Sequence, residues 1–534
     1  MDSETCADMV LLNGKIITVD SNDTIAEAVA VKDKKIIYTG DSEGIKSLIG
    51  EKTKRIDLKG KTVLPGFIDA HTHMELIANN LFWLDVHSPP LKSVEEILKK
   101  IEKKVQQTPK GEWVVGQGGF VQPMPTKGDL DAVAPEHPVV LRSSMHRYIL
   151  NSKALELAGI TSETPDPSGG EIDRDPTTGE PTGILKECYH MLPINPYPYE
   201  ELKEAIKKIC YEKFIQQGVT TIYTLPATSD SIRIYQELLK HDELPLRLRV
   251  IVTINSSAGT RKITDLDCLL KLGLQTGFGN DWLKFGGIKI FVDGEDSTAA
   301  FYDPSGQTKK WRGLLKLTQE ELTKSVVEAH KAGIQVWLHA IGDKALDMAL
   351  DAIEIALKEM PKKDHRHRIE HAGIERCTSE HLKRMKRLGI IPVPTSAWIY
   401  LGSDVPKETN VYIYRSILDH GLLPPGNSDS AGAMPESINP LFGIWCAVSR
   451  KTHTGKLMCP EERLTVMEAI RMYTINSAYA GFEEKTRGSI EIGKLADLAV
   501  LSDDPLTLLE IDKIKDINVE MTIINGKIVY EKQK

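Results

Sequence analysis

Short apolar runs recur along most of the chain, and stretches with helix-type ends separate most of them. Capping boxes at Thr318-x-x-Glu321 and Thr465-x-x-Glu468 predict two helix starts, and glycines follow several of the helices. Strand and helix in alternation are typical of parallel strands joined by crossover helices, so the pattern predicts a (β/α)8 TIM barrel. The eight strand candidates are VLPGFIDAH, GVTTIYTL, LRLRVIVTI, LKFGGIKIFV, IQVWLHAI, RIEHAGI, IIPVPTSA and GLLPPGNSD.

The two ends of the chain resemble each other more than either resembles the middle. Asn13-Gly14 and Asn525-Gly526 each lie between strand-like runs, which predicts a hairpin at both places. We therefore expect residues 1–62 and 485–534 to build one small β-sandwich beside a barrel at 63–484. About 140 residues separate the first two barrel strands, far more than one βα unit requires, and we expect roughly 80–200 to form an inserted cap subdomain over the barrel mouth.

Composition and charge exclude several classes of function. The 534 residues carry a net charge of −8 and no basic patch, which argues against a nucleic acid partner. No apolar run approaches the length of about 18 residues that a membrane span needs, and the N-terminus lacks the features of a signal peptide. Seven scattered cysteines, without a CxxC pair, fit a reducing cytoplasm. We expect a soluble cytoplasmic protein with a small-molecule substrate.

Polar residues suited to divalent metals stand where the predicted strands end. Active sites of this fold lie at the C-terminal ends of the strands, so these residues should converge. The first strand contributes two histidines at i and i+2, which point to the same face. The six candidate ligands are His71, His73, Lys289, His339, His371 and Asp429.

Imidazole and carboxylate ligands suit zinc, and also iron or manganese. Such an ion lowers the pKa of a bound water from about 15.7 to near 7, and the resulting hydroxide is the expected nucleophile. Asp429 is the expected catalytic group, taking a proton from the water and passing it to a leaving amine.

Lys289 requires a separate argument because an ammonium is no metal ligand. It is flanked by Ile288 and Ile290, where burial should lower its pKa, and a neutral lysine amine can react with carbon dioxide to form a carbamate that bridges two metals. Lys289 could instead snorkel or pair with Asp293. Glu187, or less readily Lys186, could then provide the bridge.

Other residues have bland interpretations that compete with functional ones. His365-x-His367 repeats the spacing of the first-strand pair, but its charged setting predicts solvated surface. Asp69 and Asp343 could support metal ligands or simply cap local structure. Four aromatic residues near the expected site could wall an apolar pocket or belong to the core: Phe82, Trp83, Phe120 and Trp398.

GxxDAHxH at 66–73, together with GGIKIFVDG, LHAIGDKAL, RIEHAGI and the strand-eight aspartate, resembles the metal-dependent amidohydrolase superfamily. More narrowly, the chain resembles the amidohydrolase-3 type, in the branch that contains N-substituted formamide deformylases. This resemblance implies that the six residues bind one or two metals, that Lys289 becomes N6-carboxylysine in a binuclear site, and that His146 in the insertion contacts substrate. It also allows a homodimer.

The second strand departs from that family, since it ends in Tyr223-Thr224 where relatives commonly have His-Asp; a substrate-facing group is therefore expected to differ. The resulting prediction is a hydrolase of a non-peptide C–N bond in an N-substituted amide, formamide, carbamate or cyclic amide. A deaminase, decarboxylase or isomerase could use the same site. A metal-free scaffold protein is the alternative from another class.

Overall fold

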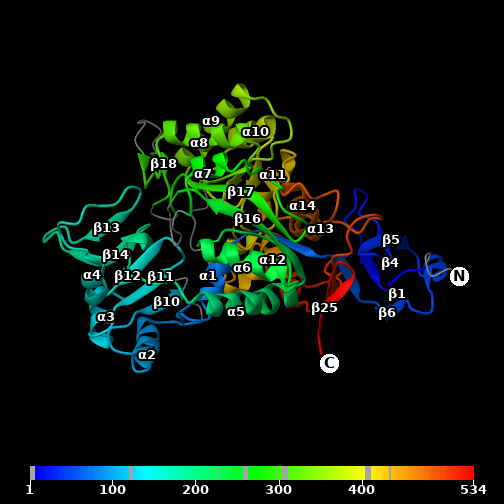
Figure 1. The fold of residues 1–534 in the computed structure, drawn as a ribbon, viewed down its shortest axis with the longest axis horizontal. Coiled ribbons are helices and arrows are strands. Elements are labelled where there is room, and N and C mark those ends of the chain that lie inside the picture. Colours follow the sequence, from blue (N-terminus) through cyan, green and yellow to red (C-terminus); the bar gives the residue numbers. More distant parts are fainter. Residues whose placement is uncertain are drawn as a thin grey trace.

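Seven parallel strands form a curled central sheet, in the order β22-β21-β20-β17-β16-β15-β8 (Figure 1). The computed structural model describes residues 6–88, 90–118, 124–226, 228–255, 263–295, 298–302, 311–402, 411–431 and 434–533. The strands span β8 (Phe67–Thr72), β15 (Val219–Thr224), β16 (Arg247–Thr253), β17 (Leu283–Phe291), β20 (Val336–His339), β21 (Arg368–Glu370) and β22 (Ile391–Val393).

The expected eighth strand is not a regular strand, because Pro424 and Pro425 supply no N–H groups for a ladder. The segment that follows them nevertheless runs along β8. The N–H of Asp429 donates to the carbonyl of His71 at 2.8 Å, and the N–H of His73 donates to the carbonyl of Ser430 at 3.0 Å. These bonds curl the sheet toward closure, and the architecture is a TIM-barrel-like α/β fold.

Helices cover the outside of the central sheet. The main ones are α5 (Tyr199–Ile209), α6 (Ser229–Lys240), α8 (Gln319–Lys331), α9 (Asp343–Glu359) and α10 (Ser379–Leu388). The capping box of α8 is confirmed, since Thr318 accepts from the N–H of Glu321 and the Glu321 carboxylate accepts from the N–H of Thr318. The capping box at Thr465 and Glu468 is confirmed in the same way at α13 (Val466–Arg471).

A second sheet of six strands lies within the segment expected as an insertion (Figure 1, left). Its order is β13 (Glu171–Arg174), β14 (Pro181–Lys186), β12 (Arg147–Leu150), β11 (Val139–Ser143), β10 (Val114–Gly118) and β9 (Leu84–Asp85). Alternate side chains enter two cores. One contains residues of α2 (Val94–Val105) and α3 (Lys127–Val133). The other contains Leu76, which follows the first barrel strand, and Ala431, which follows Asp429.

Strands from both ends of the chain share one sheet, in the order β25-β24-β23-β7-β2-β3; its strand β25 is labelled right of the centre in Figure 1. Within it β7 (Thr62–Pro65) pairs with β23 (Leu498–Leu501). The hairpin at Asn525-Gly526 is confirmed by the pairing of β24 (Val519–Ile524) with β25 (Lys527–Glu531).

The hairpin predicted at Asn13-Gly14 is wrong. There β1 (Met9–Leu12) pairs with β4 (Ala28–Lys32) and β6 (Lys54–Asp57), whereas β2 (Lys15–Ile17) pairs with β3 (Ile25–Ala26) and β7. The turn thus passes the chain from the four-stranded sheet β5-β4-β1-β6 to the six-stranded one, instead of folding it back on itself. Across the described ranges, no helix combines the length and the apolarity needed to cross a membrane.

Candidate metal centre

Three predicted ligands converge at the end of β8. His71 ends this strand's apolar run, and His73 precedes the first turn of α1 (Met74–Asn79); both side chains are buried. The Oδ1 atom of Asp429 lies 3.4 Å from Nε2 of His71 and 3.4 Å from Nε2 of His73. These three side chains form a group that could hold a metal ion.

A charged network fixes the orientation of His71. Its Nδ1 atom lies 2.5 Å from Oε2 of Glu370, and Arg368 donates to both oxygens of that glutamate at 2.8 and 2.9 Å. Burial would raise the pKa of Glu370, but Arg368 and His71 hold it at about 2. Glu370 is therefore a carboxylate that accepts the Nδ1 proton, which leaves the Nε2 lone pair of His71 directed at Asp429.

This geometry fits a cation. A histidine lone pair and a carboxylate oxygen are both acceptors, so they attract each other only through a positive charge between them. Ligand atoms about 2.1 Å from a tetrahedral zinc lie about 3.4 Å from one another, which matches the separations at Asp429. In the described part of the chain, three buried ring nitrogens here have no hydrogen-bond partner: Nε2 of His71, Nδ1 of His73 and Nδ1 of His371.

Two further predicted ligands lie beside this group. His371 follows β21 with a φ of 70°, and its Nδ1 atom is 3.6 Å from Oδ2 of Asp429. The ring centroid of His339 lies 4.5 Å from that of His371, and the Trp398 ring stacks on His371 at 5.2 Å. Burial lowers the pKa of His73 to about 4 and that of His371 to about 3. Neutral imidazoles are the form that binds metals.

Asp429 itself is ionised. Burial would raise its pKa, but its contacts with His71, His73 and His371 hold it well below the usual value. Its φ of 41° is unfavourable for a residue with a side chain, and the backbone bond to His71 holds it there. Such an outlier at a convergence of ionisable groups is typical of functional sites.

Lys289 lies on β17 with 1% of its surface exposed. Burial lowers its pKa to about 8, although the charges of Glu370 and Asp429 oppose this shift. Its Nζ atom is 5.1 Å from the ring centroid of Phe291. A substantial neutral fraction near neutral pH is the condition that carbamate formation requires, so the chemistry predicted for Lys289 stays open to test.

His146 brings the inserted sheet to the edge of this centre. Its ring centroid lies 5.8 Å from that of His339, while its Nδ1 and Nε2 atoms lie 2.7 Å from Glu187 and 3.1 Å from Glu295. Burial would lower the pKa of His146, but the two carboxylates raise it to about 9. Glu187 also lies 3.2 Å from Lys316, so the structure places the alternative bridging carboxylate in the His146 cluster.

Asp69 and Asp343, which could support metal ligands or cap local structure, have different roles. Asp69 accepts from the N–H groups of His71 at 3.2 Å and Ser428 at 3.0 Å, which fixes two ligand-bearing segments against each other. Asp343 instead accepts from the N–H of Tyr302 at 2.7 Å at the start of α9.

Of the four aromatic candidates, Phe120 lies outside the described residues.

The prediction of solvated surface for His365 and His367 is wrong. They are only 2% and 1% exposed, because these rings pack against His330. The exposed charges of this segment end at Asp364, and Arg366 and Arg368 are buried as well. Each of the six ring nitrogens of His330, His365 and His367 has a hydrogen-bond partner. Five of these partners come from another segment of the chain, and the sixth is the N–H of His367, which donates to Nδ1 of His365. They form a structural cluster at the N-terminal end of β21.

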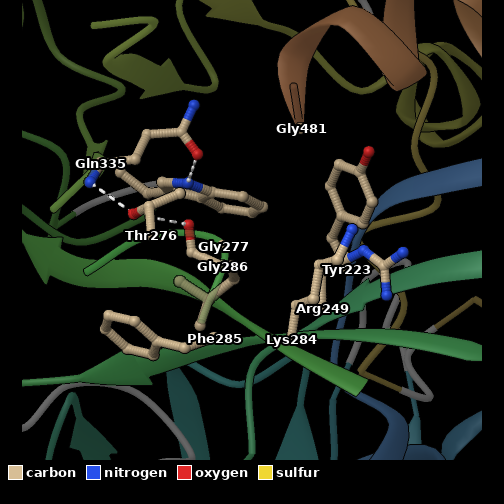
Figure 2. A pocket seen from close by; sticks show the side chains of 11 residues that line it. Tyr223, Arg249, Thr276, Gly277, Lys284, Phe285, Gly286, Gln335 and Gly481 are labelled. Carbon is tan, nitrogen blue, oxygen red and sulfur yellow. Dashed lines mark hydrogen bonds between the residues drawn. The ribbon is translucent and has the colours of Figure 1, made fainter. Parts of the chain in front are cut away.

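Tyr223 also departs from expectation, since its side chain lies in the barrel interior and its hydroxyl donates to the carbonyl of Ser477 at 2.9 Å. It lines a cavity of about 20 Å³ together with Arg249, Lys284 and Gln335 (Figure 2). That volume is enough for roughly one water molecule. None of the six predicted ligands lines the cavity, so it is no part of the metal centre.

Glu370 is the functional residue that the sequence did not single out. The only available signal was its position in RIEHAG, directly before a predicted ligand. A carboxylate that fixes a ligating histidine commonly comes from a neighbouring strand, and here β21 supplies it to β8.

The comparisons with known proteins agree with this arrangement. The model of the amidohydrolase family matches residues 54–530. N-substituted formamide deformylase of Arthrobacter pascens is 30% identical, with 98% of each chain covered. Protein LONG AFTER FAR-RED 3 of Arabidopsis thaliana is 32% identical over 98% of this chain and 92% of its own. An uncharacterized metal-dependent hydrolase from Pyrococcus horikoshii has a similar structure, with a TM-score of 0.70, 27% identity, and 94% and 98% coverage.

Proposed function

Because the chain belongs to the amidohydrolase family and is a hydrolase of C–N bonds, we propose that it cleaves a non-peptide bond in an N-substituted amide, formamide, carbamate or cyclic amide. The observation that carries the proposal is the convergence of Asp429 with a ring nitrogen of His71 and one of His73. The similarity to a formamide deformylase over the whole chain supports the bond type.

The proposed ligands are His71, His73, Lys289, His339, His371 and Asp429. Zinc is the proposed ion because the ligand set of imidazoles and carboxylate and the 3.4 Å separations suit it. When bound, such an ion lowers the pKa of water to near 7 and polarises a carbonyl group. We propose that Lys289 is carboxylated and holds a second ion, which its burial and lowered pKa favour.

Asp429 is the proposed proton carrier. As a carboxylate between three histidines it can accept a proton from a water molecule held beside it, and its second oxygen, 3.6 Å from His371, faces the other side of the site. The same carboxyl group can then donate the proton to the nitrogen of the scissile bond, so that an amine leaves.

His146 is the proposed substrate contact. It is a cation between Glu187 and Glu295, and it reaches the ring of His339 from the inserted sheet. We propose that its Nε2–H exchanges Glu295 for a carbonyl oxygen that gains negative charge during addition.

Product analysis with metal-loaded enzyme tests the reaction. Incubation with N-formyl-phenylalanine or N-formyl-2-phenylethylamine should release one amine and one formate per turnover, measured by chromatography. Release of ammonia, or of carbon dioxide without an amine, would place the enzyme in another reaction class.

Metal content of Lys289→Ala tests the proposed bridge. We expect the wild type to bind two ions per chain and the variant to lose at least one, with partial recovery in short carboxylic acids. An unchanged metal content would remove Lys289 from the ligand set and direct attention to Glu187.

We further propose the domain roles suggested by the sequence, with a barrel at 63–484, a cap formed by roughly 80–200, and a β-sandwich built from 1–62 and 485–534. The strands shared by both termini support the last of these. None of the seven cysteines forms a disulfide, which favours a cytoplasmic location. We also propose that the protein forms a homodimer and acts on a small-molecule substrate. Light scattering of the purified protein tests the oligomeric state.

A further inference from the structure

Arg142 is a buried cation whose donors are unused. It lies on β11 with 0% of its surface exposed, and in the described part of the chain its Nε, Nη1 and Nη2 atoms have no hydrogen-bond partner. Arg450 is equally buried, yet its three nitrogens donate to the carbonyls of Met458, Tyr412 and Val411 at 2.8, 2.9 and 3.1 Å. Arg487 keeps one bond, from Nη1 to Thr221, whereas none of the three Arg142 nitrogens has a partner among the described residues.

Aromatic rings occupy the space around Arg142. Its Cζ atom lies 4.4 Å from the ring centroid of Trp83 and 4.7 Å from that of Tyr189. Rings attract a guanidinium through its face, whereas its five N–H groups lie in its plane. The two rings thus stabilise the charge without using the planar donors, which are the part of arginine that binds a carboxylate with two parallel hydrogen bonds.

The side chain of Arg142 lies on the face of the inserted sheet whose core adjoins the ligand-bearing segments. It pairs across the sheet with Tyr148, so the two side chains share a face, and Tyr148 and Trp83 belong to the core that includes Leu76 and Ala431. Leu76 follows His73 by three residues, or about 4.5 Å along a helix. Ala431 follows Asp429 by two residues. The guanidinium therefore lies in the layer between the inserted sheet and the ligand-bearing segments.

We propose that Arg142 binds a carboxylate group of the substrate, so that the amides this enzyme cleaves are those of N-acylated amino acids or similar acids. The inference rests on the proposed function, since it assigns a substrate class to that same site. Aromatic faces on the guanidinium leave its edge as the recognition surface, and a planar anion matches that edge. A site built around buried donors also rejects neutral analogues, because their binding would leave the donors unpaired.

A matched pair of substrates tests this inference on the metal-loaded enzyme. N-formyl-phenylalanine and N-formyl-2-phenylethylamine differ by the carboxylate alone. We expect kcat/KM of the wild type to favour the acid by at least about a hundredfold. Arg142→Met should lower kcat/KM for the acid and so remove that preference. Equal rates for the two amides in the wild type would overturn the inference while leaving the proposed function intact.

Calorimetry separates the inference from catalysis, with 3-phenylpropanoate and 3-phenylpropanamide as probes. We expect only the acid to bind, with Arg142→Met losing at least about a hundredfold in affinity at unchanged metal content. That result would support the carboxylate site even if neither formamide were cleaved, a failure that would count against the proposed function alone. Unchanged binding of the acid by Arg142→Met would overturn the inference.

Two variants control for folding and charge. Arg147→Met removes the same charge from the neighbouring strand β12, whose alternation points Arg147 to the opposite face from Tyr148, and it should leave acid binding unchanged. Arg142→Lys keeps the charge but loses the planar fork, so we expect it to fold and to bind the acid at least tenfold more weakly than the wild type. Wild-type affinity in Arg142→Lys would show a structural cation and contradict the proposal.

Discussion

Two histidine clusters lie at opposite ends of the same barrel, and β21 belongs to both. His367 precedes this strand and packs with His330 and His365, whereas His371 follows it and lies beside Asp429. Both clusters are buried, and each contains a His-x-His pair. They differ in where the ring nitrogens find partners.

In the N-terminal cluster each ring has one donor and one acceptor satisfied by protein. His367 accepts from the N–H of Val336 at 3.1 Å and contacts Nδ1 of His330 at 2.9 Å, and Nε2 of His330 lies 2.7 Å from the carbonyl of Met360. His365 accepts from the N–H of His367 at 2.9 Å and lies 2.7 Å from the carbonyl of Leu388. These partners assign neutral tautomers to all three rings.

In the C-terminal cluster three ring nitrogens have no protein partner within the described ranges. Two of them, Nε2 of His71 and Nδ1 of His371, lie 3.4 and 3.6 Å from the Asp429 carboxylate. The comparison teaches that burial and spacing do not distinguish a structural histidine from a ligand. The direction of its lone pair does, because buried acceptors that face each other require a cation between them.

The largest expected effect comes from the C-terminal cluster. His71→Ala or Asp429→Asn should lower kcat/KM by at least about a thousandfold, because the ion and the proton carrier supply several kcal/mol and each 1.36 kcal/mol is tenfold. Circular dichroism should show a folded barrel in both variants. Activity within tenfold of the wild type would show that the C-terminal cluster is not the catalytic one.

His367→Ala should show the opposite behaviour. It leaves the N–H of Val336 and Nδ1 of His330 without partners, and the free energy of unfolding should fall by about 3 kcal/mol in urea denaturation. Activity per folded molecule should stay within about twofold when the metal sites are filled. A loss of bound metal in this variant would mean that the N-terminal cluster has a ligand role.

Glu370→Gln sharpens the comparison within the C-terminal cluster. An amide keeps the size of the side chain but loses the charge that holds the Nδ1 proton of His71, so metal affinity should fall by about 10- to 100-fold in competition with a chelator. Asp347→Asn, in the half-buried pair with His381 between helices on the barrel exterior, is the matched control and should bind metal like the wild type. Equal affinities of the two variants would contradict the positioning role.

The smallest expected effect concerns pH. Burial lowers the pKa of His365 in the folded state, so the unfolded state takes up more protons below its own pKa of about 6.5. Stability from the neutral ring is present above that pH and is lost as the pH falls. Between pH 7.5 and 5.5 the wild type should lose more stability than His365→Gln, by at most about 1.4 kcal/mol, because the Gln amide can still donate to Leu388 but does not titrate. Parallel pH profiles would show that the pKa of His365 is the same in the folded and unfolded states.

Sequence reasoning reached most of the barrel and the ligand convergence because both depend on local patterns. A His-x-His pair at the end of an apolar strand can be recognised without coordinates, as can the capping box of α8. It failed at Asn13-Gly14, where a sound turn signal connects two different sheets, since pairing partners come from segments far away in the chain. It also failed at the eighth strand, where the apolar pattern predicted a regular strand although two prolines cannot donate ladder hydrogen bonds.

The remaining errors concern side chains whose meaning depends on distant partners. Nothing in KKDHRHRIEH shows that His330 pairs with His367. Glu370 gains its role from His71, almost 300 residues earlier in the chain. Arg142 differs from the other buried arginines in having no hydrogen-bond partner for its three nitrogens among the described residues, and only coordinates reveal such a feature.

Anomalous diffraction at the zinc edge, from crystals of metal-loaded enzyme, tests the central claim most directly. The account predicts a peak within bonding distance of His71, His73 and Asp429, and none near His330, His365 or His367. A zinc-saturated crystal with no peak at the first group, or with its peak at the second, would contradict the account.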